Sequence, residues 1–299
     1  MDSQISTDHM SMSEKSGSVL QFDRNWSERE ETHYNHWVRG RPVNQIQLAF
    51  RQHWKLFSEM MDNAREGRCL EVGCGRGSIS SYFADNGFDC VLLDSSRSVL
   101  ETAQSIFQRN GHKATFLHGD ALCLPLESDC FDVVVSIGLL EHFEDVKTLL
   151  AEQVRVLRPG GLFLGYVVPE RPQNIQRYFN WINSMLKFGG RVACGFRRSE
   201  SKAVKTTVYR SDYGSERYRA ALEGQPVRDV GSFGMYPLPM ISHSPEFPFS
   251  LLPAPAEWLL ARIFEAVLHA RRVVSGRNPW ICSEALGQAF LLTFCKAGT

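Results

Sequence analysis

The sequence predicts an α/β fold, in which a mostly parallel sheet carries helices on both faces. Short apolar runs suited to buried strands alternate with longer segments whose apolar residues recur every three or four positions. Helices are expected from Ser78, from Arg97 and over Val146 to Leu157, where a Pro-Gly-Gly turn ends the pattern. The predicted strands cover residues 70–73, 88–94, 114–117, 131–137, 162–168, 227–236 and 289–295.

One more helix is predicted ahead of the first strand. Its apolar residues share one face, and Pro42 is expected to open it; they are Ile46, Phe50, Trp54, Phe57 and Met61. We expect this face to pack against the sheet. The aromatic residues just upstream, including Tyr34 and Trp37, have two interpretations: part of a lid that contacts a substrate, or ordinary packing anchors.

The first predicted strand runs into a glycine loop, Gly73-x-Gly75-x-Gly77. Glycines after a strand let the backbone turn sharply and approach a ligand that any Cβ would displace. A dinucleotide loop has the spacing Gly-x-Gly-x-x-Gly, whereas here the third glycine comes one residue early. The loop therefore favours a nucleotide-like ligand other than a dinucleotide.

Two acidic residues indicate which ligand this is. Glu71, just before the loop, would repel a pyrophosphate but could attract a cationic amino group through a bound water. Asp94 ends the second predicted strand, where a carboxylate can accept hydrogen bonds from the hydroxyls of a ribose. The combination points to a nucleoside that carries a cationic group.

These residues resemble the class I S-adenosylmethionine-dependent methyltransferases, and within them the ubiquinone and menaquinone methyltransferase group. Glu71 to Gly77 is similar to that family's first motif, and Asp94 to its ribose-binding acid. Further similar segments follow in family order between about residues 68 and 169: Gly119-Asp120-Ala121 at the adenine loop, Phe131 to Ser136 as the fourth strand, Gly138 to His142 as the loop after it, and Leu157 to Gly161 as the turn into the fifth strand.

The resemblance implies a Rossmann-like fold with seven strands, the last antiparallel between the fifth and the sixth, and a substrate-side insertion after the fifth. It implies S-adenosylmethionine as the cofactor and a small-molecule methyl acceptor. The residues that it places at the cofactor are Glu71, Gly73, Cys74, Gly75, Gly77, Asp94, Ser95, Asp120, Ala121 and Ile137.

A sulfonium methyl group is already activated, so the protein needs a base only where the nucleophile must lose a proton. His142 follows the fourth strand at the carboxyl end of the sheet, where ligands bind in open α/β folds, and is the first candidate. Glu141 is the second, since it could also touch the substrate. The alternative is that both residues brace the following helix. No spacing of His or carboxylate residues indicates a metal site.

Acceptor choice is expected to lie in residues 170–288, which are less regular than the core. Residues 187–219 hold nine Lys or Arg against three Asp or Glu. Either this segment is simply solvated, or it caps the site, with Arg197 and Arg198 contacting an anionic group on the acceptor. A helix with Trp258, Ile263 and Val267 is expected either to pack in the core or to help admit a partly apolar acceptor.

Composition limits the other function classes. Lys plus Arg (33) equals Asp plus Glu (33) in 299 residues, so no overall field attracts nucleic acid or an anionic membrane. Eight cysteines without a Cys-x-x-Cys pair indicate reduced thiols. We expect a cytoplasmic protein without stable membrane insertion.

We further expect a disordered tail over residues 1–20 and a single domain over 21–299. Within that domain the expected parts are an N-terminal helical lid (28–66), a cofactor-binding core (67–169) and a substrate cap with the last strands (170–299).

Two alternatives remain open at this point. One is an NAD(P)-dependent oxidoreductase on a related sheet, against which stand the loop spacing and the lack of a Tyr followed four residues later by Lys. The other is a non-catalytic regulatory protein that binds S-adenosylmethionine. The lack of an Asn/Asp-Pro-Pro-aromatic motif after the fourth strand disfavours amino methylation of adenine or glutamine, which leaves O-, C- or amine N-methylation.

Overall fold

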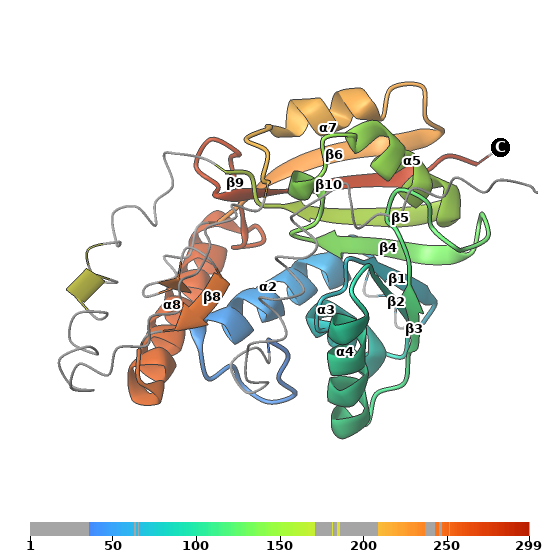
Figure 1. The fold of residues 1–299 in the computed structure, drawn as a ribbon. Coiled ribbons are helices and arrows are strands. Elements are labelled where there is room, and N and C mark those ends of the chain that lie inside the picture. Colours follow the sequence, from blue (N-terminus) through green and yellow to red (C-terminus); the bar gives the residue numbers. More distant parts are fainter. Residues whose placement is uncertain are drawn as a thin grey trace, which may run out of the picture.

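The computed structural model describes residues 36–62, 64, 66–170, 181, 184–185, 209–236, 243–244, 247–250 and 252–298. An eight-stranded sheet in the order β3-β2-β1-β4-β5-β10-β6-β9 forms its centre (Figure 1). The strands are β1 (Arg68–Val72), β2 (Asp89–Asp94), β3 (Thr115–His118), β4 (Phe131–Ile137), β5 (Leu157–Val167), β6 (Val227–Met235), β9 (Ile281–Cys282) and β10 (Ala289–Lys296). The short strands β7 (His243–Ser244) and β8 (Phe247–Ser250) pair separately.

The predicted sheet is confirmed. β1 to β5 pair in parallel, and β10 runs antiparallel between β5 and β6, as expected. The count is eight rather than seven, because the two-residue strand β9 adds to the edge beside β6. All carboxyl ends of β1 to β5 therefore meet at one edge, which is the edge at which the glycine loop lies.

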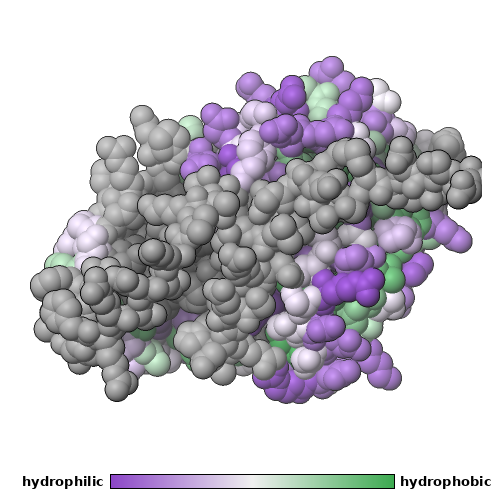
Figure 2. Space-filling view, viewed as in Figure 1, coloured by the Kyte–Doolittle hydropathy of each residue, from purple (hydrophilic) through white to green (hydrophobic). Residues whose placement is uncertain are grey.

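Helices cover both faces of the sheet (Figure 1). On one face, side chains of four helices enter the same hydrophobic cluster: α2 (Gln45–Met60), α3 (Ser78–Asp85), α4 (Arg97–Asn110) and α8 (Ala254–Ser275). On the other face lie α5 (Val146–Val156) and α7 (Ser215–Ala221). Figure 2 shows hydrophilic residues over α7, where Glu216 and Arg217 are exposed while Tyr218 is buried.

Helix α2 differs from the expectation in two respects. Its N-cap is Asn44, whose side chain accepts a hydrogen bond from the Gln47 N–H, so Pro42 precedes the helix rather than opening it. Its buried surface also extends beyond the predicted face to Gln45 and Leu48, because α8 packs beside α2. The buried Glu257 carboxylate of α8 accepts from the Gln45 N–H (3.1 Å) and from its side-chain amide (2.9 Å).

Helix α8 is only partly a core helix. Phe264 and Leu268 are buried, whereas Trp258, Ile263 and Val267 are 51%, 47% and 42% exposed. The two groups lie on different sides of one helix, so the apolar face predicted from the sequence is divided between the core and the surface. No helix within the described ranges is long and apolar enough to cross a bilayer.

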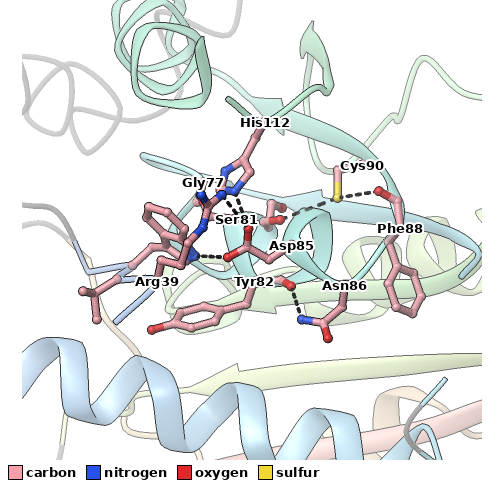
Figure 3. A network of polar contacts seen from close by, with 12 residues as sticks. Arg39, Gly77, Ser81, Tyr82, Asp85, Asn86, Phe88, Cys90 and His112 are labelled. Atoms are coloured by element: carbon pink, nitrogen blue, oxygen red, sulfur yellow. Dashed lines mark hydrogen bonds and ion pairs between the residues drawn. The ribbon is translucent and has the colours of Figure 1, made fainter. Parts of the chain in front are cut away.

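The carboxylate of Asp85, at the end of α3, binds the segment before α2 (Figure 3). Its Oδ2 accepts from the Trp37 indole N–H at 2.9 Å, and its Oδ1 lies 3.3 Å from the Arg39 guanidinium and 2.9 Å from His112 Nε2. Trp37 is buried and meets His112 edge to face at 4.8 Å. Asp85 thus joins the N-terminal segment, α3 and the turn after α4.

Replacing Asp85 by Ala should lower the free energy of unfolding by about 1–3 kcal/mol, since it leaves the buried Trp37 N–H without its acceptor. Urea denaturation measures the change. Glu101→Ala, at an exposed position of α4, is the control and should change stability by less than about 0.5 kcal/mol. Equal, small effects of both substitutions would contradict the role given to Asp85.

Candidate functional site

The glycine loop lies at the carboxyl edge of the sheet, between β1 and α3. Gly73, Gly75 and Gly77 all have left-handed backbone, with φ of 70°, 51° and 66°. Two consecutive loop N–H groups, those of Gly73 and Cys74, donate to the Leu93 carbonyl at 2.9 and 3.0 Å. The loop is therefore tied to the end of β2, and glycine is favoured at each of the three positions by φ alone.

Two of these glycines also lie against protein side chains. A Cβ on Gly77 would lie 2.5 Å from Leu92 and 2.6 Å from Phe107, and one on Gly73 would lie 2.7 Å from Leu139. These two positions therefore leave room for protein side chains, and their place in the cofactor site stays a prediction. Gly77 lets α3 begin close to β2 and α4. Gly73 leaves room for the side chain of Leu139, which follows β4.

Gly77→Ala should destabilise the fold more than Gly111→Ala, which is the matched control. Both positions have positive φ, 66° and 75°, but a Cβ at Gly111 meets nothing within 4 Å. We expect a loss of about 1 kcal/mol from the backbone at both positions and a further 1–3 kcal/mol or so from overpacking at Gly77. Denaturant unfolding of the two variants measures the difference, and equal losses would show that the packing at Gly77 is not tight.

Asp94 connects the two loops of this edge. Its Oδ2 accepts from the Gly75 N–H and its Oδ1 from the Ser96 N–H, both at 3.0 Å. Burial raises the pKa of Asp94, and the backbone hydrogen bonds work in the opposite direction. Its carboxylate is partly exposed at the end of β2, the position that the sequence analysis assigned to ribose binding.

Glu71 lies under the loop. It is 3% exposed, and its Oε2 accepts from both the N–H and the hydroxyl of Ser80 in α3, at 3.2 and 2.5 Å. Burial raises its pKa to about 8, although the bonds from Ser80 lower it. Glu71 therefore also anchors α3 against β1. Ser80 was not singled out from the sequence, and its place in the first turn of a predicted helix was the available signal.

The loop after β3 holds Asp120 and Ala121. Gly119 N–H donates to the Asp94 carbonyl at 3.1 Å, so this loop begins beside Asp94. The Oδ1 of Asp120 accepts from the Leu122 N–H at 2.9 Å, and Ala121 is buried. The structure thus brings Gly75, Asp94 and Asp120 to the same edge, as predicted.

The remaining predicted cofactor residues lie at this edge as well. Cys74 is 4% exposed, and the Ser95 carbonyl lies 3.0 Å from His118 Nε2. Ile137 ends β4 and is half-buried beside Tyr166 of β5. Burial raises the pKa of the Cys74 thiol, which makes it a poor nucleophile.

The two candidate bases occupy a short 3₁₀ helix, η3 (Leu140–His142), directly after β4. Glu141 is 1% exposed, and its Oε2 has no hydrogen-bond partner among the described residues. His142 Nδ1 lies 2.7 Å from the Tyr209 carbonyl, so Nδ1 carries the proton. The backbone of Tyr209 therefore lies at the carboxyl edge of the sheet.

Electrostatics favour Glu141 over His142 as a base near neutral pH. Burial raises the pKa of Glu141 to about 7, and it lowers the pKa of His142 to about 4. Arg210 lowers both pKa values. A carboxylate that titrates near 7 matches proton transfer at neutral pH, whereas an imidazole that titrates near 4 is a weak base.

Aromatic side chains from α2, β5 and the segment after α8 meet around His53. His53 of α2 lies 4.4 Å from Tyr166 and 5.4 Å from Trp280, measured between ring centroids. The Trp280 N–H donates to His53 Nδ1 at 3.0 Å, and burial lowers the pKa of His53 to about 3, so this imidazole is neutral. His53 and Trp280, 227 positions apart, could not be paired from the sequence.

Of the residues predicted to bind the acceptor, the structure describes Trp37 alone. Its indole N–H donates to Asp85 at the end of α3, so this contact anchors the N-terminal segment, and a contact of Trp37 with substrate stays a prediction. Tyr34, Arg197 and Arg198 lie outside the described residues. No three His, Cys, Asp or Glu side chains form a group able to hold a metal ion within the part of the chain that the structure describes.

Comparison with known proteins is consistent with this geometry. Residues 70–165 match the family model described as "Methyltransferase domain". The chain is similar to the uncharacterized methyltransferase YcgJ of Bacillus subtilis, with 31% identity over 40% of this chain and 48% of the relative. It is also similar to a ubiquinone biosynthesis O-methyltransferase of Rickettsia conorii, with 32% identity over 36% of each chain. The matches therefore span less than two-thirds of these relatives' lengths.

Solved structures show the same fold. The crystal structure of YcgJ aligns with a TM-score of 0.51 at 19% identity, over 83% of this chain and all of that one. The [4+2]-cyclase SpnF aligns with a TM-score of 0.50 at 19% identity, over 89% and 87% of the two chains. Residues 70–165 are thus similar in sequence to a methyltransferase domain, and the described chain shares the fold of these solved structures. The resemblance to a cyclase shows that the fold alone does not determine the reaction.

The raised pKa of Glu141 predicts a pH-dependent stability. The folded state binds the proton of Glu141 more tightly than the unfolded chain does, because the usual pKa of a glutamate is 4.5. The stabilisation from this protonated carboxyl is fully present below pH 4.5 and is lost as the pH rises through about 7. Glu141→Gln, which cannot ionise, should gain on the order of 2 kcal/mol relative to the unsubstituted protein between about pH 5 and about pH 8.

Urea unfolding at several pH values measures this difference. Glu71 contributes equally to both proteins, so its own titration cancels in the comparison. Glu144→Gln, three residues away and exposed, is the control and should follow the unsubstituted protein. Parallel stability curves for Glu141→Gln and the unsubstituted protein would contradict the assignment.

Proposed function

We propose that this protein transfers a methyl group from S-adenosylmethionine to a small-molecule acceptor, by O-, C- or amine N-methylation. The observation that carries the proposal is the meeting of Gly75, Asp94 and Asp120 at one sheet edge within a methyltransferase domain. The ubiquinone O-methyltransferase among the relatives supports a small-molecule acceptor. We expect the reaction to take place in the cytoplasm.

The residues present fit the methyl donor. Asp94 supplies a partly exposed carboxylate for the two ribose hydroxyls, and Asp120 supplies an acceptor oxygen for the adenine amino group. The loop from Gly73 to Gly75 would lie against the amino-acid portion, with Glu71 beneath it. A bound cationic ammonium would favour the ionised form of the Glu71 carboxyl, against the effect of burial, which raises its pKa to about 8. Ala121, Cys74, Ser95 and Ile137 would supply the surrounding contacts.

S-adenosylmethionine supplies a sulfonium methyl, whose C–S bond breaks with its electron pair left on sulfur as the acceptor's nucleophilic atom bonds to the methyl carbon. Glu141 then acts as the base: its carboxylate takes the proton that the nucleophile loses. The burial that raises its pKa also excludes water from this part of the edge. His142 orients η3 through the Tyr209 carbonyl and does not itself accept the proton.

Asp94→Asn should weaken binding of S-adenosylhomocysteine, because the hydrogen bonds from the ribose would no longer be charge-assisted. We expect a loss of about 1–3 kcal/mol in a calorimetric titration. Asp89→Asn is the matched control, since Asp89 begins the same strand at the opposite edge and its side chain is 64% exposed. An unchanged affinity in Asp94→Asn would remove Asp94 from the proposed site.

Turnover tests the whole proposal. Radiolabelled S-adenosylmethionine, mixed with small-molecule extracts or with quinol and amine acceptors, should label a product with the native protein but not with Asp94→Asn. With that acceptor, kcat/KM of the native protein should rise with pH through about 7 as Glu141 loses its proton. Binding of the nucleoside without transfer to any acceptor would favour a regulatory protein instead.

A further inference from the structure

Helix α5 reaches the loop after β3 through one ion pair, Glu152 and Arg155. The Arg155 guanidinium donates to both Glu152 carboxylate oxygens, from Nε at 2.7 Å and from Nη2 at 2.8 Å. The pair is partly buried, with side chains 19% and 32% exposed. The hydrogen bonds from Arg155 hold the pKa of Glu152 below its usual range, so the pair is ionised at neutral pH.

Both side chains bind the backbone of the loop. Arg155 Nη1 donates to the Leu126 carbonyl at 2.7 Å, and Nη2 donates to the Leu124 carbonyl at 3.0 Å. Glu152 Oε2 accepts from the Leu124 N–H at 2.7 Å. Three backbone groups of one loop are thus satisfied by two side chains of one helix, an arrangement that needs the planar fork of an arginine.

The contacts that fix residues 124–126 also affect the start of the same loop, at Gly119 and Asp120. Pro125 Cδ lies 2.9 Å from the position that a Cβ on Gly119 would take, so the two ends of the loop are in contact. Between them, the Asp120 carbonyl accepts from the Cys123 N–H at 3.1 Å. Moving residues 124–126 would therefore move Gly119 and Asp120.

We infer that Glu152 and Arg155 are positioning residues for recognition of the adenine base, acting through residues 119–126. The inference rests on the proposed function, since it takes Asp120 as the acceptor for the adenine amino group. It gives α5 a specific role in nucleoside selectivity. The recognised chemistry is the exocyclic amino group, a hydrogen-bond donor that a carboxylate can accept.

The test compares S-adenosylhomocysteine with S-inosylhomocysteine, in which a carbonyl replaces that amino group. In calorimetric titrations, Arg155→Lys, which keeps the charge but loses the fork, should weaken binding of S-adenosylhomocysteine about ten-fold. Its affinity for the inosine compound should change much less, so the preference between the ligands shrinks. Glu152→Gln keeps an acceptor for the Leu124 N–H and should weaken binding by only about two- to three-fold.

Glu265→Gln on α8 is the matched control. Glu265 pairs with Arg262 three residues earlier at 2.7 Å, and Arg262 also holds a loop carbonyl, that of Pro42, but far from the proposed nucleoside site. This variant should lose thermal stability as Arg155→Lys does while it keeps the preference for the adenine compound.

Two results would overturn the positioning role: unchanged affinity for S-adenosylhomocysteine in Arg155→Lys, or equal losses for both ligands. Either result, with normal binding by the unsubstituted protein, rejects the role of Glu152 and Arg155 and leaves the proposed function standing. If the unsubstituted protein binds neither compound, the proposed function fails and the positioning role fails with it.

Discussion

The carboxylate of Asp94 is the interaction on which the arrangement of this site depends. By accepting from the Gly75 and Ser96 N–H groups, it holds the loop after β1 against the loop after β2. The Asp94 carbonyl accepts from Gly119 and brings in the loop after β3 as well. One residue at the end of β2 therefore sets the relative positions of three loops that come from three strands. A ligand that spans those loops meets them already assembled, which lowers the entropic cost of binding.

A second constraint comes from the helices on the α2 face. α8 lies outside the matched residues 70–165, and it is joined to α2 by the buried pair of Glu257 and Gln45. Trp280, just after α8, bonds to His53 of α2, which in turn faces Tyr166 at the end of β5. The C-terminal part of the chain is thereby connected to the carboxyl edge at which Glu141 lies. These contacts join segments outside residues 70–165 to that edge.

The sheet could be predicted from the sequence because its strands are short apolar runs with clear boundaries, and the order of motifs implied the position of β10. The addition of β9 could not, since two residues carry no pattern. The face of α2 was predicted only in part, because its second buried side depends on α8, some 200 residues away. Local periodicity does not report such a partner.

The candidate site, like the fold, could be predicted from the sequence only in part. Gly75, Asp94 and Asp120 follow strands directly, so their common edge could be inferred from the parallel sheet. The packing of Gly73 and Gly77 could not be predicted, because their neighbours, Leu139, Leu92 and Phe107, come from elsewhere in the chain. The choice between His142 and Glu141 could not be made either, since burial sets their pKa values in opposite directions. The crystal structure of the complex with S-adenosylhomocysteine tests the central claim most directly. The account predicts the ribose hydroxyls against Asp94 and the adenine beside Asp120 and Ala121; a nucleoside bound away from Asp94 would contradict it.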